Sequence, residues 1–378
     1  MTAVGEAGRA NNRAPGRAIQ IDASGSANVG QTQFMDNRDL LLEVKNLQTH
    51  FRVHGGVVRA VDGVTFQIRR GQTLGVLGES GCGKSVTGYS VLRLVRPPGQ
   101  IVGGEILFHR APAANGAQRG AVVDLVKLDP FGREIREIRG AEIAMVFQEP
   151  MTSLDPVYTI GDQLAEAVIH HENVSKPIAR LRAIESLRRV GLPQPEQAID
   201  KYPHQLSGGM RQRVMIAMAL ICGPSLLIAD EPTTALDVTT EAQILALLRE
   251  LQADFGMAIL FITHNLGVIA EMAEEVIVMY LGSVVEQADV KTLFRAPKHP
   301  YTKALMRSIP RLGQKSGERL NAIQGMVPAP SDIPTGCPFH PRCPEAMPGL
   351  CNVKQPPLIQ VGDRHTVRCL LYEGNPTG

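Results

Sequence analysis

The sequence predicts an α/β protein whose core is a parallel β-sheet. Three short apolar runs read as buried strands, and the first two are each followed by a loop and then by a stretch of helical character. Strands that are buried on both faces have this continuous apolar pattern, and a helix between them returns the chain for parallel pairing. The runs are Thr73–Leu77, Leu226–Ala229 and Ala258–Thr263.

The N-terminal third is expected to begin with a leader and to continue in β structure. Residues 1–39 are rich in small and polar residues and lack the apolar region of a secretory signal, so they are predicted to be a disordered leader. A strand is expected to begin at Leu40, and β character returns over 57–68. Residues 111–120 are rich in Ala and Gly without periodicity, which predicts an exposed insertion.

A helical subdomain is predicted over about 150–205, after a short buried strand at 143–147. Ser175 is placed to cap a helix that begins near Pro177. The predicted apolar face of this helix repeats every three residues, at Ile178, Leu181, Ile184 and Leu187.

The core is predicted to resume after this subdomain and to end near residue 290, so that the main domain spans 40–290. Helices are expected over 208–222 and 241–253, and a hairpin over 276–287 turns at Gly282. Residues 291–378 are Pro-rich and irregular and contain four of the six cysteines, which predicts a separate C-terminal extension.

A glycine-rich loop follows the first apolar run. The segment Gly78-Glu79-Ser80-Gly81-Cys82-Gly83-Lys84-Ser85 fits the pattern G-x-x-x-x-G-K-[ST]. Its glycines let backbone N–H groups turn toward phosphate oxygens, and the N-terminus of the next helix favours an anion. Lys84 is expected to reach the β- and γ-phosphates, and Ser85 to bind Mg²⁺. A chance glycine-rich turn is the alternative, and the flanking strand and helix argue against it.

Two adjacent acids close the run Leu226–Ala229. At the end of a buried strand, Asp230 is placed to join the Mg²⁺ shell and Glu231 to polarise an attacking water as general base. The alternative, a solvated acidic loop, is disfavoured because a phosphate loop occurs in the same chain.

A second glycine-rich helix start is present at Leu206-Ser207-Gly208-Gly209-Met210. Ser207 could cap the helix and donate to a phosphate. One ATP needs one phosphate cradle, so a second cradle makes sense if it completes the site of a neighbouring subunit. An N-capped core helix remains the alternative.

Taken in this order, the motifs resemble the ATP-binding-cassette (ABC) ATPases over roughly residues 40–290. The resemblance implies a P-loop NTPase cassette with a RecA-like parallel-sheet core, an antiparallel β subdomain and an inserted helical subdomain. It identifies Gln148 as the residue that links the γ-phosphate to a transmembrane partner, and His264 as the switch histidine. Phe51 has the position of an aromatic residue that stacks on adenine. One departure is Met210, where many members have Gln.

The resemblance also implies the reaction, in which ATP and water give ADP and phosphate, with ATP sandwiched at a dimer interface. The implied catalytic residues are Glu231, His264 and Gln148, and the Mg²⁺ ligands are Ser85, Gln148 and Asp230. The implied nucleotide-binding residues are Phe51, Gly78, Ser80, Gly81, Cys82, Gly83, Lys84, Ser85, Val86, Ser207, Gly208, Gly209 and Asp237.

Four cysteines of the extension are spaced C-x5-C, C-x7-C and C-x17-C. In a reducing compartment such a set indicates a metal site rather than disulfides. Four thiolates suit a [4Fe–4S] cluster or tetrahedral Zn²⁺, and nearby His340 and His365 keep a mixed zinc site open. Unpaired structural thiols are the other alternative. The four residues are Cys337, Cys343, Cys351 and Cys369.

Three segments resemble the ATPase subunits of dipeptide and oligopeptide importers: residues 147–156, 299–302 and 337–343. Asp155 departs from the Asn that is common there. Some members carry a C-terminal [4Fe–4S] cluster, which favours iron–sulfur over zinc. The resemblance implies a peripheral translocase subunit at the cytoplasmic face of the membrane. Its partners would be a second, different ATPase subunit, two transmembrane permease subunits and an extracytoplasmic substrate-binding protein. Nickel complexes or glutathione are alternative cargoes.

Composition and length argue against other functions. A net charge of +2 is too close to neutral for a protein that binds nucleic acid by neutralising phosphates. No apolar run approaches the ~18 residues that cross a bilayer. ABC ATPases that act on DNA are the runner-up, but they would need a long coiled-coil or zinc-hook insertion between Lys84 and Ser207. Translational ABC factors typically have two cassettes, and one is present here.

Overall fold

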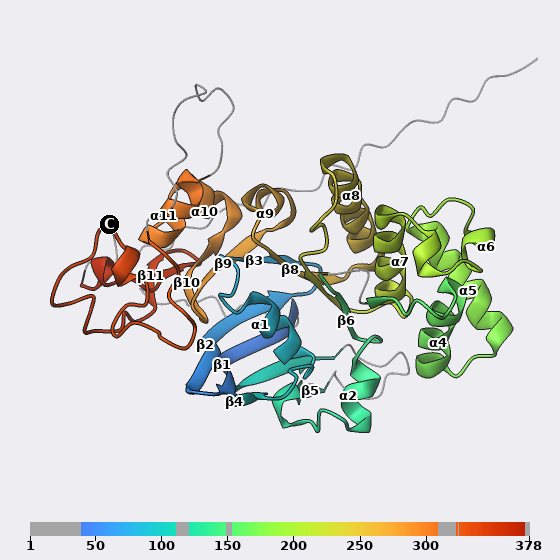
Figure 1. The fold of residues 1–378 in the computed structure, drawn as a ribbon, viewed down its shortest axis with the longest axis horizontal. Coiled ribbons are helices and arrows are strands. Elements are labelled where there is room, and N and C mark those ends of the chain that lie inside the picture. The colour runs from blue at the N-terminus through green and yellow to red at the C-terminus, as the bar shows by residue number, and fades with distance from the viewer. Residues whose placement is uncertain (1–38, 111–120, 149–152, 309–322, 324, 375–378) are drawn as a thin grey trace, which may run out of the picture. The chain divides into compact units, whose positions relative to one another are not determined.

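Two β-sheets and the helices around them are described by the structure, a computed structural model that covers residues 39–110, 121–148, 153–308, 323 and 325–374. Asp39–Gly378 forms one unit (Figure 1). The predicted leader, apart from its last residue, and the predicted insertion at 111–120 lie outside the described residues.

The larger sheet has eight strands in the order β11-β12-β10-β9-β3-β8-β7-β6. Its centre is parallel, with β3 paired to both β8 and β9, and β7 paired to β8 and β6. Every residue of these five strands is buried, which explains their continuous apolar sequences and confirms the predicted core. Their bounds are β3 Thr73–Leu77, β6 Ile143–Val146, β7 Leu226–Asp230, β8 Ala258–Thr263 and β9 Glu275–Tyr280.

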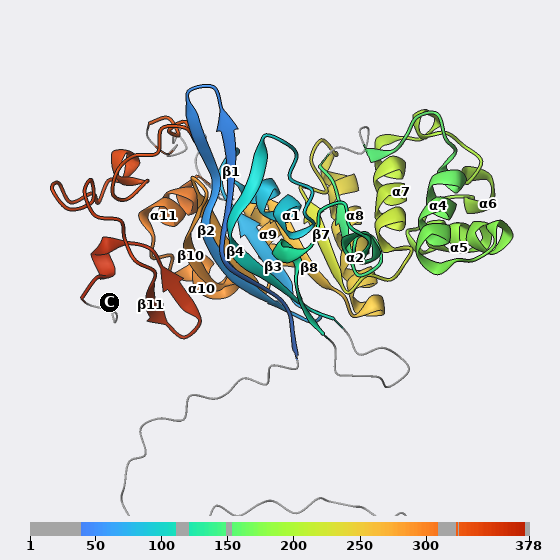
Figure 2. The same cartoon turned by 90° about the horizontal axis from the view of Figure 1, so that it is seen from below.

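The smaller sheet is antiparallel, in the order β2-β1-β4-β5. Its first strand begins at Leu40, as predicted. Helix α1 (Lys84–Val91) contacts both sheets and is packed between them (Figure 2). The strands are β1 Leu40–Val53, β2 Gly56–Arg69, β4 Gly99–His109 and β5 Val122–Asp124, followed by the 3₁₀ turn η2 Leu125–Lys127 and α2 Arg133–Ile138.

A group of helices follows β6, where the helical subdomain was predicted (Figure 1). The apolar face predicted for α5 was wrong at Ile178 and Leu181, which are 49% and 68% exposed, and was confirmed at Leu187, which is fully buried. The buried face is Ala179, Ala183 and Leu187, since a spacing of four keeps closer to one side of a helix with 3.6 residues per turn. The elements are α4 Ile160–Glu172, α5 Lys176–Arg189, α6 Pro195–Ala198, η3 Pro203–Gln205 and α7 Gly208–Leu220.

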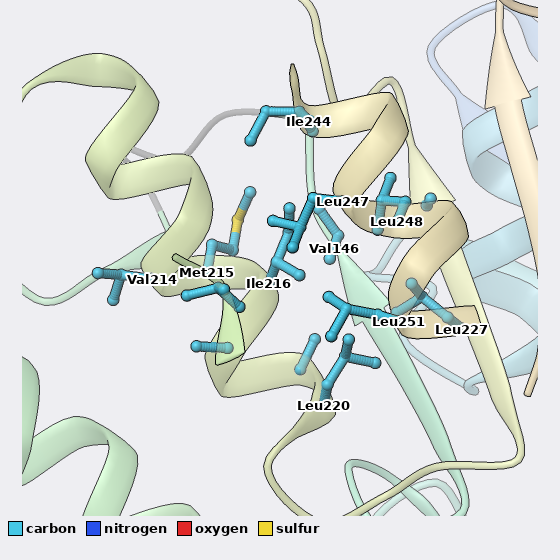
Figure 3. Packing of buried hydrophobic residues seen from close by; sticks show 14 of the residues in the cluster. Val146, Val214, Met215, Ile216, Leu220, Leu227, Ile244, Leu247, Leu248 and Leu251 are labelled. Carbon is cyan, nitrogen blue, oxygen red and sulfur yellow. The ribbon is translucent and has the colours of Figure 1, made fainter. Parts of the chain in front are cut away.

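Helices α7 and α8 (Val238–Phe255) pack together against β6 and β7. Figure 3 shows Ile216 and Leu220 of α7 beside Leu247 and Leu251 of α8, in one apolar cluster that includes Val146 and Leu227. Helix α9 (Leu266–Met272) contacts β3 and β8. This packing fixes the start of α7 relative to the strands that end at the acidic residues.

The C-terminal extension continues the larger sheet. Strand β10 forms the predicted hairpin with β9, and β12 adds to β10. No helix among the described residues is long and apolar enough to cross a membrane. The remaining elements are β10 Ser283–Asp289, α10 Val290–Arg295, α11 Pro300–Arg307, η4 His340–Arg342, β11 Ile359–Gly362, β12 His365–Val367 and η5 Leu370–Tyr372.

Candidate active site

The predicted phosphate loop connects β3 to α1. Gly83 begins the helix with φ of 100°, and a Cβ there would lie 2.0 Å from the carbonyl oxygen of Ala60. A Cβ at Gly78 would lie 2.4 Å from the carbonyl oxygen of Met279. Only glycine fits either position, so the close packing of the loop on β2 and β9 requires both. Ser80 and Gly81 are exposed at the tip of the loop, whereas Cys82 is buried.

The side chain of Lys84 is folded back onto its own loop. Its Nζ donates to the carbonyl oxygens of Gly78 at 2.7 Å and Glu79 at 3.1 Å. Lys84 is only 5% exposed, so a cation sits buried beside the loop. This arrangement places positive charge where the loop can receive an anion.

Asp230 ends β7 and faces Ser85 at the start of α1. The Ser85 hydroxyl donates to Asp230 Oδ1 at 2.9 Å, while buried Oδ2 has no hydrogen-bond partner among the described residues. Burial raises the pKa of Asp230 to about 6, and the neighbouring charge of Glu231 adds to the rise. A buried carboxylate with a free oxygen beside a hydroxyl is a donor set that suits Mg²⁺.

Glu231 lies directly after β7, with φ of 47°, an unusual conformation for a residue other than glycine. Its carboxylate accepts hydrogen bonds from Gln148 Nε2 at 3.1 Å and from the Thr234 hydroxyl at 2.9 Å. His264 Nδ1 lies 2.9 Å from Glu231 Oε1. The structure therefore brings together all three predicted catalytic residues, which come from the ends of three neighbouring parallel strands.

The same contacts decide the protonation of Glu231. Burial raises the pKa of its carboxyl, but the hydrogen bonds from His264 and Thr234 outweigh burial, and the net pKa is lowered. Glu231 is therefore ionised at neutral pH and able to accept a proton.

The second glycine-rich helix start is exposed. Ser207 is the N-cap of α7, and its hydroxyl accepts from the N–H of Met210 at 3.3 Å. Helices α1 and α7 lie apart in both views, so one chain does not place them against each other (Figures 1 and 2). A Cβ on Gly209 would lie 2.9 Å from Thr240, whose N–H is capped by Asp237 at the start of α8. The predicted residues at the starts of α7 and α8 are therefore neighbours.

Phe51 shares a groove with two other predicted site residues. It packs against Gly99 and lines a groove of about 800 Å³ together with Val86, Tyr89 and Gln148. Its predicted contact with adenine stays a prediction.

The four cysteines of the extension line one small pocket with a volume of about 10 Å³. Burial raises the pKa of the Cys343 thiol to about 11 and that of Cys369 to about 12. Within the described part of the chain, no group of three or more His, Cys, Asp or Glu side chains is arranged to hold a metal ion. The four thiols therefore share a pocket, and their role as metal ligands stays a prediction.

Some site contacts were not predicted from the sequence. Thr234 bonds Glu231 from the turn after β7, and Tyr301 and Arg342 reach Glu79 of the phosphate loop from the C-terminal extension. Arg342 is 263 residues from Glu79 in sequence. A contact between residues so far apart in sequence cannot be predicted from the spacing of residues within a motif.

Two family profiles match the chain. The profile described as ABC transporter matches residues 61–234, and the profile described as oligopeptide/dipeptide transporter, C-terminal region, matches residues 285–351. The oligopeptide transport ATP-binding protein AppD of Bacillus subtilis is 51% identical over 333 residues, which cover 88% of this chain and 97% of AppD. The dipeptide transport ATP-binding protein DppD of Haemophilus influenzae is 47% identical over 339 residues, 89% of this chain and 98% of DppD.

A solved structure supports the fold. The dimeric ATP-binding cassette MJ0796, in a post-hydrolysis state bound to ADP and Pi, is 27% identical to this chain. The match has a TM-score of 0.56 and covers 66% of this chain and 99% of the cassette. The fold is thus that of an ABC cassette. AppD and DppD are 51% and 47% identical to this chain along nearly their whole length. The chain therefore belongs to the ATP-binding proteins of the ABC transporter family that have the oligopeptide/dipeptide transporter C-terminal region.

Proposed function

We propose that this chain hydrolyses ATP to energise an ABC importer of peptides. The observation that carries the proposal is the meeting of a phosphate loop, the Ser85–Asp230 pair and the carboxylate of Glu231 at one edge of the sheet. The names of the relatives, which include oligopeptide and dipeptide transport ATP-binding proteins, support peptides as cargo.

ATP binding uses the loop and its buried cation. The backbone N–H groups around Ser80 to Gly83 and the N-terminus of α1 would hold phosphate oxygens. Lys84, which donates to two loop carbonyls in the structure, would turn its ammonium toward the β- and γ-phosphates.

The residues present fit Mg²⁺, because Asp230 offers a buried oxygen without a hydrogen-bond partner among the described residues. Ser85 and Gln148 would complete the protein ligands. When bound, Mg²⁺ supplies charge neutralisation on the phosphates. The Ser85 hydroxyl would then present its oxygen to the ion instead of donating to Asp230.

Glu231 is proposed as the general base. Three hydrogen bonds hold its carboxylate in one orientation, and its lowered pKa keeps it ionised to receive a proton from water. Gln148 and His264 would turn toward the γ-phosphate when ATP is bound. Loss of the hydrogen bond from His264 would raise the pKa of Glu231 and make it a stronger base when substrate is present.

A second ATPase subunit and membrane permease partners follow from membership in the family. We propose that Ser207, Gly208 and Gly209 of one subunit close on ATP held by the other, since their exposed helix start is separate from α1 of the same chain. Asp237, at the adjacent start of α8, would lie in the same interface. The dimeric state of MJ0796 supports this arrangement.

The finer assignments of partners are also proposals. We propose a second ATPase subunit of different sequence, two permease subunits and an extracytoplasmic receptor, with this chain peripheral at the cytoplasmic face. The main domain over 40–290 and the extension over 291–378 remain the predicted division of the chain.

We further propose that Cys337, Cys343, Cys351 and Cys369 hold a [4Fe–4S] cluster, with Zn²⁺ as the alternative. Support comes from their convergence on one pocket and from the chemistry of four thiol donors. Protein purified without oxygen should contain about four iron and four sulfide per chain. Zinc without sulfide would establish the alternative. The absence of both iron and zinc would exclude a metal site at these cysteines.

The catalytic proposal is tested by Glu231→Gln in the assembled transporter. The variant should bind ATP but lose turnover by ~100-fold or more, the scale of a general base. Glu250→Gln, an exposed change on α8, is the control and should retain full turnover. Near-normal ATPase activity of Glu231→Gln would exclude Glu231 as the base.

A further inference from the structure

Glu79, the second residue of the phosphate loop, is held from three directions. Its N–H donates to the hydroxyl of Tyr301 at 3.0 Å, and its carbonyl oxygen accepts from Lys84 Nζ at 3.1 Å. Its carboxylate accepts two hydrogen bonds from Arg342, at 2.8 and 3.2 Å. The neighbouring tip residues Ser80 and Gly81 are exposed, so Glu79 is where the rest of the protein holds this side of the loop.

Arg342 comes from the cysteine segment, one residue before Cys343. Its side chain is 4% exposed and also donates to the hydroxyl of Tyr280 at 3.4 Å. A guanidinium that makes two parallel hydrogen bonds to a carboxylate fixes both position and orientation. The Glu79 side chain is 26% exposed, so the pair is shielded from water on the Arg342 side and partly open on the Glu79 side.

An aromatic cluster makes the contact rigid. The rings of Tyr280 and Tyr301 lie 4.7 Å apart, and Phe339 packs on both at 5.3 and 5.4 Å. Tyr280 ends β9, Tyr301 is on α11, and Phe339 lies in the cysteine segment with Arg342. The sheet and the C-terminal extension therefore meet at the phosphate loop.

We propose that Arg342 is a positioning residue for ATP binding, through which the C-terminal extension sets the conformation of the phosphate loop. It acts through Glu79: the Arg342 guanidinium neutralises the Glu79 carboxylate and fixes the carbonyl that receives Lys84. Loss of Arg342 would leave a negative charge beside the phosphate site and free the loop to move. The inference rests on the proposed ATPase function and concerns affinity for the nucleotide, not the chemical step.

The test measures ATP affinity and steady-state kinetics of the full chain in its complex. Arg342→Gln should raise the Kd and KM for ATP about 10-fold and leave kcat within about twofold, since the reacting groups are untouched. Arg342→Lys keeps the charge but not the paired geometry, and should raise the Kd by about threefold. Glu79→Gln combined with Arg342→Gln should be no worse than Arg342→Gln alone, because the two residues act as one unit.

The matched control is Arg364→Gln. Arg364 also joins the extension to the larger sheet, through Glu275 at 3.0 Å, but it does not contact the loop. Its Kd for ATP should equal that of the wild type. Melting temperature and iron content are measured for every variant, and if Arg342→Gln fails to fold, Arg342→Lys and Glu79→Gln carry the comparison.

Each outcome decides the inference. A wild-type Kd in the Arg342 variants, strictly additive effects in the double variant, or equal weakening by Arg364→Gln would overturn it. Failure of the wild-type complex to bind ATP would instead overturn the proposed function.

Discussion

Asp230 and Glu231 are adjacent carboxylates that the fold holds in different environments. Burial raises the pKa of Asp230 to about 6, although a hydrogen bond from Ser85 opposes the rise. For Glu231 burial also acts to raise the pKa, but hydrogen bonds from His264 and Thr234 lower it overall. The end of β7 thus carries two different carboxylates. Burial disfavours the charged form of Asp230 unless a cation is bound, whereas Glu231 is an ionised base.

Asp230 should make the binding of Mg·ATP sensitive to acid. A proton added at a pKa of about 6 competes with Mg²⁺, so the affinity should fall by about tenfold per pH unit below that value. Calorimetric titration between about pH 5 and pH 8 measures this dependence. Asp230→Asn retains the titration of ATP itself and should show a shallower slope. Identical slopes for the two proteins would contradict the assignment.

Gly83→Ala should abolish tight ATP binding. The added Cβ would lie 2.0 Å from the Ala60 carbonyl oxygen, so the loop must shift away from β2. Gly256→Ala is the control, because it also has positive φ but open space around the Cβ, and should cost only about 1 kcal/mol without affecting ATP. The Kd for ATP and urea unfolding distinguish these effects. Normal ATP affinity in Gly83→Ala would show that the loop does not need this packing.

Most site residues could be predicted because their types are constrained by local chemistry. The loop glycines, Lys84 and Asp230 each occur in a short motif whose spacing encodes the geometry. Arg342 could not be predicted, since its role depends on a contact between segments 263 residues apart.

At the scale of elements, buried polar contacts join the C-terminal extension to the larger sheet. Glu286 of β10 is fully buried, and its Oε1 lies 2.8 Å from Nε2 of His365 on β12. The N–H groups of Lys298 and His299 donate to the same carboxylate at 2.7 and 2.9 Å. Burial raises the pKa of Glu286, but these hydrogen bonds, led by His365, lower it overall.

Glu286→Gln should lower the free energy of unfolding by about 2 kcal/mol, the scale of a buried hydrogen bond to a charged group. Because the folded pKa is lowered, the wild-type contribution is complete above the unfolded pKa and is lost as the pH falls through the folded pKa. Urea unfolding at neutral and acidic pH measures both effects. Glu345→Gln, which removes an exposed partner of Lys303, should cost less than about 1 kcal/mol. Equal losses for the two variants would refute this explanation.

The elements themselves were predictable where burial leaves a simple pattern. The five parallel strands are largely apolar runs. The hairpin of β9 and β10 is marked by Gly282 at its turn. The buried face of α5 was assigned wrongly because alanines, which carry little hydrophobic signal, make most of it. Strands β11 and β12 were missed since they are short and are stabilised by pairing with a distant strand.

At the scale of the whole molecule, we expect the proposed site to need two chains. The phosphate loop and the start of α7 are both suited to phosphate, but α1 and α7 lie apart (Figure 1). A second subunit would supply the missing half. The fold class and ATPase family followed from ordered motifs, whereas the joining of the extension to the core sheet required the structure.

The Glu231→Gln chain should associate with its partner ATPase subunit when ATP is added, because ATP is bound but not cleaved. Adding Ser207→Asp should prevent this association, since aspartate still caps α7 but repels the phosphate. Ser175→Asp, the same change at the exposed start of α5, should have no effect. Sedimentation velocity measures the association. Normal assembly with Ser207→Asp would place α7 outside the interface.

The most direct measurement is peptide uptake by the complete complex in lipid vesicles with ATP on the side of this chain. The wild-type complex should accumulate peptide in an ATP-dependent way, and accumulation should fall by about 100-fold with Glu231→Gln. Accumulation that is unchanged in Glu231→Gln, or that proceeds without consumption of ATP, would contradict the proposed function.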